Sequence, residues 1–131
     1  MGARAVLKSI IASFPDAEIS ITIVWINKLA ADSREAAARS AGIFKDSRVC
    51  QFYDPQQLSG RAVADSLGWQ GRIAWDIYLF YTAGSKWNDT APTPVDWVHQ
   101  LEDQWADSDR LRTGDGLVQA IKEIMNARMA A

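Results

Sequence analysis

Apolar and polar residues alternate along the chain with two periods, one typical of helices and one of strands. Between Ala3 and Phe14 the apolar residues recur at steps of three and four, which predicts an amphipathic helix ending at Pro15. Ile19 to Ile26 is rich in β-branched residues and carries no charge. This composition is typical of a strand buried on both faces, so we expect it in the centre of a sheet.

A second helix and a second strand follow. Asp32 and Glu35 have the spacing of a helix cap whose carboxylate reaches back, which predicts a helix from Ser33 through the alanine-rich run to Phe44. Arg48 to Asp54 is predicted to be a short strand.

The middle of the chain adds a third helix and the longest apolar strand. Asp54-Pro55 predicts a helix start, because aspartate accepts hydrogen bonds from free first-turn amides and proline lacks the amide that would be unpaired there. Gly68 supplies a left-handed residue that ends this helix. Ile73 to Tyr81 is then predicted to be a strand, with Asp76 as its only charge.

The last third of the chain is predicted to be helical. Thr93-Pro94 has the pattern of a cap followed by a first-turn proline. The apolar residues after it share one helical face: Pro94, Trp97, Val98, Leu101 and Trp105. A polar loop from Asp107 to Gly114 precedes a final helix, expected from Asp115 to Met129.

Strands separated by helices of these lengths favour parallel pairing with right-handed crossovers. We therefore expect one α/β domain over residues 1–131, with a parallel or mixed sheet flanked by helices on both faces. Its additions are an extra amino-terminal helix and extended carboxyl-terminal helices. The length of 131 residues fits one continuous core.

Three segments in the middle of the chain carry a family resemblance. Val49 to Pro55 is a strand ending in Asp-Pro, Ala62 to Trp69 is a helix end with Leu-Gly and an apolar residue, and Ile77 to Gly84 is an apolar strand with Phe and a glycine turn. Together they resemble the thioredoxin-like fold superfamily over residues 48–87. The resemblance implies a three-layer thioredoxin-like domain.

The chain departs from that family where its chemistry would lie. The redox cysteines would fall near residues 28–33, which here contain no cysteine, and the cis proline and its neighbour correspond to Trp75 and Asp76. The chain has a single cysteine and therefore no C-x-x-C motif. Disulfide exchange by a dithiol needs two thiols, so we expect a divergent, redox-inactive member.

Composition narrows the possible partners and the compartment. The net charge of -2 gives no general attraction to nucleic acid or to anionic membranes. Apolar runs are too short to span a bilayer, and the first residues do not resemble a signal peptide. One cysteine excludes an internal disulfide, so the expected compartment is the cytoplasm. We expect neither a metal nor a cofactor, because the usual ligand clusters and phosphate loops are missing from the sequence.

The isolated reactive side chains are expected to be structural. Cys50 lies in the middle of a predicted strand, where a cysteine is usually buried and inert. His99 falls on the polar side of the predicted helix and is expected to be exposed. A Cys50–His99 nucleophile pair would need these two positions to meet.

The candidate ligand-binding residues are Asn27, Lys28, Trp75, Asp76 and Trp87. Asp76 is a charge inside an apolar strand, so it either lines a pocket or bonds to nearby amides. In a thioredoxin-like arrangement Trp75 would lie beside the loop from Asn27 to Ser33, where that fold binds extended peptides. Trp87 would fold over nearby, although tryptophans are also ordinary core residues.

Three functions remain open from the sequence. The first is a noncatalytic binding module for a protein, a peptide or a small molecule. The second is an enzyme with an unidentified pocket, using residues from the set Asp76, Tyr78, Asn27, Lys28 and Cys50. The third is a homo-oligomer in which a tryptophan patch forms the subunit interface.

Overall fold

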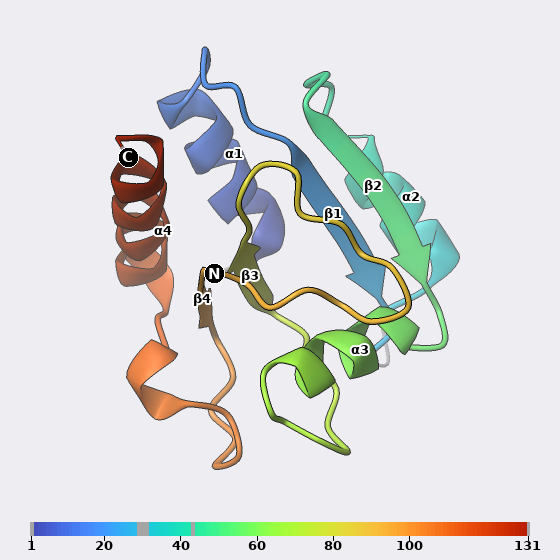
Figure 1. The fold of residues 1–131 in the computed structure, drawn as a ribbon. Helices are drawn as coiled ribbons and strands as arrows, with labels where there is room; N and C mark the ends of the chain where they lie inside the picture. Colours follow the sequence, from blue (N-terminus) through green and yellow to red (C-terminus); the bar gives the residue numbers. More distant parts are fainter. Residues whose placement is uncertain (1, 29–31, 43, 131) are drawn as a thin grey trace.

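The computed structural model describes residues 2–28, 32–42 and 44–130, and it shows a mixed α/β fold (Figure 1). The elements of this described part follow in the order α1 (Ala3–Ser13), β1 (Ile21–Ile26), α2 (Arg34–Ala41), β2 (Val49–Asp54), α3 (Leu58–Ser66), β3 (Ile77–Phe80), β4 (Asp96–His99), the 3₁₀ turn η1 (Ser108–Arg110) and α4 (Gly114–Met129). The predicted first and last helices and the strand at Val49–Asp54 are confirmed.

The strands of the described part form two sheets of two strands each. β1 and β2 are parallel, with Ile21 opposite Val49 and Ile26 opposite Asp54. β3 and β4 are antiparallel, with Ile77 opposite His99. The expectation of a central β1 buried on both faces is wrong, because β1 forms a strand ladder with β2 only and Val24 is 40% exposed.

The predicted helix starts are displaced. Ser33, not Asp32, caps α2: its hydroxyl accepts a hydrogen bond from the Ala36 amide at 3.0 Å, while the Asp32 carboxylate accepts from the Lys28 amide at 2.8 Å. α3 begins at Leu58 instead of Pro55, because a turn follows β2 before the helix forms.

The predicted helix after Pro94 is wrong, since Asp96–His99 is a strand. The apolar spacing of Trp97, Val98 and Leu101 fits a helical face, but pairing with β3 determines the conformation. β3 is also shorter than predicted, because Asp76 adopts a left-handed conformation with φ 52° that ends the strand before Ile77.

The β3–β4 pair separates two hydrophobic cores. Side chains on one face join a core that includes Val63, Ala64, Trp69, Ala74, Trp97, Leu101 and Ala106, with Ile77 and Leu79 packed against it. Side chains on the other face join a core built from Val6, Ile10, Val98, Leu117, Ile121 and Met125, with Tyr78 and Phe80 packed against it. Successive strand residues alternate between the cores, as the strand period requires.

His99 lies at the centre of this arrangement and is 0% exposed, so the expectation of an exposed histidine is wrong. The Leu101 amide donates to its Nδ1 at 2.9 Å, which fixes the proton on Nε2. Nε2 then donates to the Asp107 carbonyl at 2.7 Å. The ring is stacked with Trp97 and makes an edge contact with Trp69. Both nitrogens are occupied, so this imidazole has a structural role.

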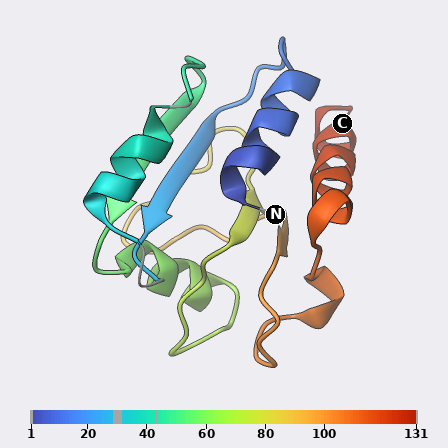
Figure 2. The ribbon, with the colours of Figure 1, turned by 180° about the vertical axis from the view of Figure 1, so that it is seen from behind.

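The helices lie on both sides of the parallel strands. Figures 1 and 2 show α1 and α2 on one side of β1, and the long connection 81–95 crossing the other side. α3 packs against the carboxyl end of β1 on that second side. A Cβ at Gly60 would lie 2.7 Å from Ile26 Cδ1 and from Ile73 Cγ2, so this close packing requires glycine. No helix of the described residues is long and apolar enough to cross a membrane.

Replacing His99 is expected to destabilise the fold. The change His99→Ala leaves the Leu101 amide and the Asp107 carbonyl without their partners and opens a cavity between two tryptophans. We expect the free energy of unfolding to fall by about 2–4 kcal/mol in urea denaturation. Met129→Ala, at an exposed position, is the control and should change it by less than about 0.5 kcal/mol. Equal stability of wild type and His99→Ala would contradict the structural role.

Candidate binding site

The five predicted site residues are held by different partners. Asn27 Nδ2 donates to the Tyr53 hydroxyl at 2.9 Å, and the Asn27 carbonyl accepts a hydrogen bond from the Gln57 side chain. The Lys28 amide donates to Asp32. These contacts gather Asn27 and Lys28 at the carboxyl ends of β1 and β2.

Trp75, Asp76 and Trp87 have other surroundings. Trp75 is half-buried and packs against the core that contains Trp97. Asp76 is bound by Gln100 twice: the Gln100 side chain donates to Oδ1 at 2.7 Å, and the Gln100 amide donates to the Asp76 carbonyl at 3.1 Å. Trp87 is 49% exposed in the connection between β3 and β4. The predicted residues therefore contribute to a polar cluster, a strand end and an exposed loop.

The contacts of Asp76 favour its structural interpretation. Gln100 closes the open end of the β3–β4 pair and holds Asp76 in its left-handed conformation. Tyr78 lies close by, and burial together with the negative charge of Asp76 raises the pKa of the Tyr78 hydroxyl above its usual value. This hydroxyl is buried and makes no hydrogen bond within the described part of the chain.

Cys50 is exposed, so the expectation of a buried thiol is wrong. Its position opposite Thr22 lies in the middle of the parallel sheet, whereas His99 is buried between Trp69 and Trp97. Because both ring nitrogens of His99 are already bonded, the pair cannot act as nucleophile and base.

A polar cluster surrounds the carboxyl ends of β1 and β2. Arg34 lies over the Tyr53 ring, 4.7 Å from its centroid. Asp54 accepts hydrogen bonds from the Leu58 and Ser59 amides, at 3.1 and 2.8 Å, and from the Ser59 hydroxyl. Burial acts to raise the pKa of Asp54, but the hydrogen bonds from Ser59 and from neighbouring amides outweigh it, so the pKa lies below its usual value. The cluster thus fixes α3 to the sheet.

The side of the parallel sheet away from α2 carries an apolar surface, here called the open face. Its residues are Thr22, Val24, Cys50 and Phe52, which pair as Thr22–Cys50 and Val24–Phe52 across the two strands. Phe52 is 56% exposed and Val24 is 40% exposed. Leu58, at the start of α3, is 63% exposed. Neighbouring exposed apolar side chains of this kind are typical of an interaction surface.

The outer edge of β4, the side turned away from β3, is closed by side chains and backbone from the carboxyl-terminal part. Arg110 donates to the Trp97 carbonyl at 2.8 Å, and the Asp96 carboxylate accepts from the Trp97 amide at 2.9 Å. The Arg112 amide donates to the His99 carbonyl at 2.9 Å. Arg128 donates to the Val95 carbonyl at 3.2 Å. A further strand therefore cannot pair here without breaking existing bonds.

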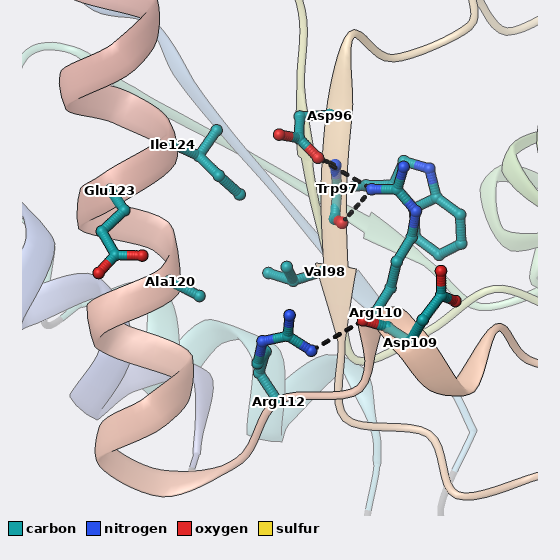
Figure 3. Close-up of a pocket in the computed structure, with 9 residues that line it drawn as sticks. All are labelled: Asp96, Trp97, Val98, Asp109, Arg110, Arg112, Ala120, Glu123 and Ile124. Atoms are coloured by element: carbon teal, nitrogen blue, oxygen red, sulfur yellow. Dashed lines mark hydrogen bonds and ion pairs between the residues drawn. The ribbon is translucent and has the colours of Figure 1, made fainter.

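A hollow of about 300 Å³ lies between this closed edge and α4 (Figure 3). Figure 3 shows Val98 pointing toward α4 and the Trp97 ring pointing to the opposite side of the strand. Arg110 forms an ion pair with Asp96 at 2.9 Å and lies 4.5 Å from the Trp97 ring centroid. Arg110 and Asp96, two of the charged groups lining the hollow, are thus already engaged in stabilising β4, which makes the hollow a weaker candidate than the open face.

Within the part of the chain that the structure describes, the outer edge of β2 has no such closure at Gln51 and Tyr53. The Arg48 carbonyl accepts from the Ile21 amide at 2.9 Å and the Asp54 carbonyl accepts from the Asn27 amide at 3.3 Å, so even-numbered residues of β2 direct their backbone groups to β1. Gln51 and Tyr53 therefore direct theirs outward. Among the described residues, no hydrogen bond reaches these outward amides and carbonyls of Gln51 and Tyr53. β2 is thus the unprotected edge beside the open face.

Sequence reasoning missed the open face, although a signal was present. Cys50 and Phe52 alternate with Gln51 and Tyr53 along β2, and that period of two separates an apolar face from a polar one. The polar face is bonded internally: Gln51 accepts from Trp25 Nε1 at 2.9 Å and donates to the Ala41 carbonyl at 3.2 Å. Because Gln51 points toward α2 and neighbouring strand residues point to opposite faces, Phe52 points to the open face.

Comparisons with known proteins found no match for this chain among protein-family models, curated proteins or solved structures. No group of three or more His, Cys, Asp or Glu side chains that could hold a metal occurs in the part of the chain that the structure describes. The open face and the outer edge of β2 are therefore the features of the described chain that best support a function.

The cap formed by Asp54 predicts a pH-dependent loss of stability. The Asp54→Asn variant would keep one acceptor oxygen and lose the charge that binds the Leu58 and Ser59 groups. The pKa of Asp54 is lowered by folding, so its contribution is complete above the unfolded value of about 4 and is lost as the pH falls through the folded value. We expect the variant to be about 1 kcal/mol less stable at pH 7. Urea denaturation at neutral and acidic pH measures this difference, which a pH-independent result would contradict.

The contacts of Asp76 predict different effects of two substitutions. Asp76→Asn keeps an acceptor for Gln100 and a residue that tolerates the left-handed conformation, so we expect a change below about 0.5 kcal/mol. Asp76→Ala loses the bond and is strained at positive φ, and should lower the free energy of unfolding by about 1–3 kcal/mol. Thermal and urea denaturation provide the measurement. If both variants lose the same free energy of unfolding, the stabilisation comes from the negative charge of Asp76 and not from its hydrogen bond or its conformation.

Proposed function

We propose that this chain is a redox-inactive, thioredoxin-like interaction module that binds an extended polypeptide segment along β2. From β1 onward the element order is β-α-β-α-β-β-α, with a parallel first pair and an antiparallel second pair. This is the order of the thioredoxin-like core, and α1 is the addition. The arrangement of α2 and α3 on opposite sides of β1 supports the same three-layer assignment.

One observation carries the proposal: an unpaired strand edge lies beside exposed apolar side chains. Backbone groups of Gln51 and Tyr53 point outward from β2, and Phe52 stands on the open face between them. An extended segment that adds to a sheet edge gains affinity from main-chain hydrogen bonds and specificity from alternate side chains. Phe52 and Cys50 are placed to contact every second side chain of such a segment.

The proposed module needs no catalytic group. Its single cysteine stands exposed on the open face, which fits a reducing compartment such as the cytoplasm. Asn27 and Lys28 lie at the carboxyl end of the same strand pair, so a bound segment that extends past Asp54 would reach them. Trp87 lies in the connection that crosses this side of β1, and it is a second apolar contact for the segment.

Peptides selected from a display library against the wild-type protein test this function. We expect their dissociation constants to rise at least about tenfold in Phe52→Ser, because the variant loses an apolar contact beside the strand edge. Isothermal titration calorimetry gives the constants for both proteins.

Met129→Ser is the matched control, since Met129 is a 44% exposed apolar residue at the end of α4, outside the open face. It should leave peptide affinity unchanged. If the selected peptides bind Phe52→Ser as tightly as they bind the wild-type protein, the binding site does not include Phe52 and the proposal of a site along β2 is wrong.

A further inference from the structure

We infer that one polypeptide segment bound by the β2 edge is β2 of a second copy of this chain. The inference rests on the proposed function and names its partner. In the dimer, two β2 strands pair antiparallel about a two-fold axis through Gln51, and the parallel pair of each copy becomes half of a four-stranded sheet. Dimers with two-fold symmetry are the commonest homo-oligomers.

The difference between the outer edge of β4 and the outer edge of β2 is the first support for this partner. The β4 edge is closed by Arg110, Asp96 and Arg128, whereas β2 carries neither lysine nor proline within Val49–Asp54 and has outward backbone groups without partners among the described residues. Native proteins protect the strand edges that must stay unpaired. The selective protection of β4 indicates that pairing at β2 is tolerated.

The second argument is that β2 is complementary to itself. With the axis at Gln51, the amides of Gln51 and Tyr53 donate to the carbonyls of Gln51 and Val49 in the second copy. The same register sets Cys50 opposite the second copy's Phe52, and Phe52 opposite the second copy's Cys50. Two exposed apolar groups of each open face are therefore covered by one symmetric contact.

A two-fold axis requires the antiparallel direction. Pairing about Gln51 places Arg48 of one strand opposite Asp54 of the other, twice. Arg48 is ion-paired with Asp46 and Asp54 is bonded to Ser59, so this register sets no two like charges of β2 opposite each other. The side chains of Gln51 and Tyr53 are already bonded to Trp25 and Asn27, so pairing requires only the backbone of this edge.

Sedimentation velocity over a dilution series tests the inference, with Phe52→Glu as the disrupting variant and Met129→Glu as the control. Both positions are exposed, at 56% and 44%, so both variants should fold, which near-UV circular dichroism verifies. We expect a wild-type dimer whose dissociation constant rises at least about tenfold in Phe52→Glu, because two carboxylates enter an apolar contact. Met129→Glu, at the end of α4, should leave the constant unchanged. In hydrogen exchange, the amides of Gln51 and Tyr53 should lose protection on dilution.

A wild-type protein that stays monomeric up to its solubility limit overturns the inference. So does a dimer that Phe52→Glu leaves intact, or one that Met129→Glu disrupts equally. The peptide titrations separate this outcome from the proposed function: a monomer that binds selected peptides through Phe52 retains the binding module and loses only the second copy as its partner.

Discussion

The antiparallel pairing of β3 with β4 is the interaction on which the rest of this structure depends. Adjacent residues of a strand point to opposite faces, so Trp97 packs in one core and Val98 packs in the other. Both cores are filled only if β4 is a strand. It also places His99 where the Leu101 amide and the Asp107 carbonyl satisfy its two nitrogens. A buried polar ring is stable only when it is bonded in this way, so the loop after β4 is fixed by the strand before it.

The same pairing determines which sheet edge stays open. Because α4 and the η1 segment pack beside β4, arginines from this region reach the outward carbonyls of Val95 and Trp97. β2 lies at the opposite margin, where α2 covers one face and no segment of the described chain bonds to the outward backbone groups of Gln51 and Tyr53. Protection at the β4 edge and exposure at the β2 edge thus follow from where the carboxyl-terminal helix packs, and this difference is the reason why we propose β2 as the binding edge.

Much of the fold could be predicted, and the errors have a common cause. The helix at Ala3–Ser13 and the strand at Val49–Asp54 follow from local period, and Gly68 has the left-handed conformation expected at a helix end. The sequence predicts a helix at Asp96–His99 because its apolar residues have the spacing of one helical face. The same spacing also fits a strand whose side chains enter two cores on opposite sides, and this is the structure that forms. Of the five predicted site residues, Asn27 and Lys28 lie at the carboxyl end of the strand pair that carries the proposed binding edge, while Asp76 is held by Gln100.

Local sequence was sufficient for the number and type of most elements and for the lack of dithiol chemistry, because apolar period and cysteine count depend on the chain alone. Exposure was different. His99 is buried and Cys50 is exposed, the reverse of expectation, because burial depends on which segments cover a face after folding. Phe52 belongs to an apolar pattern that normally indicates a core. α3 is short and covers only the carboxyl end of the sheet, and the connection 81–95 that crosses this side still leaves Phe52 56% exposed. The exposure of Phe52 was therefore decided by tertiary packing and not by the local pattern.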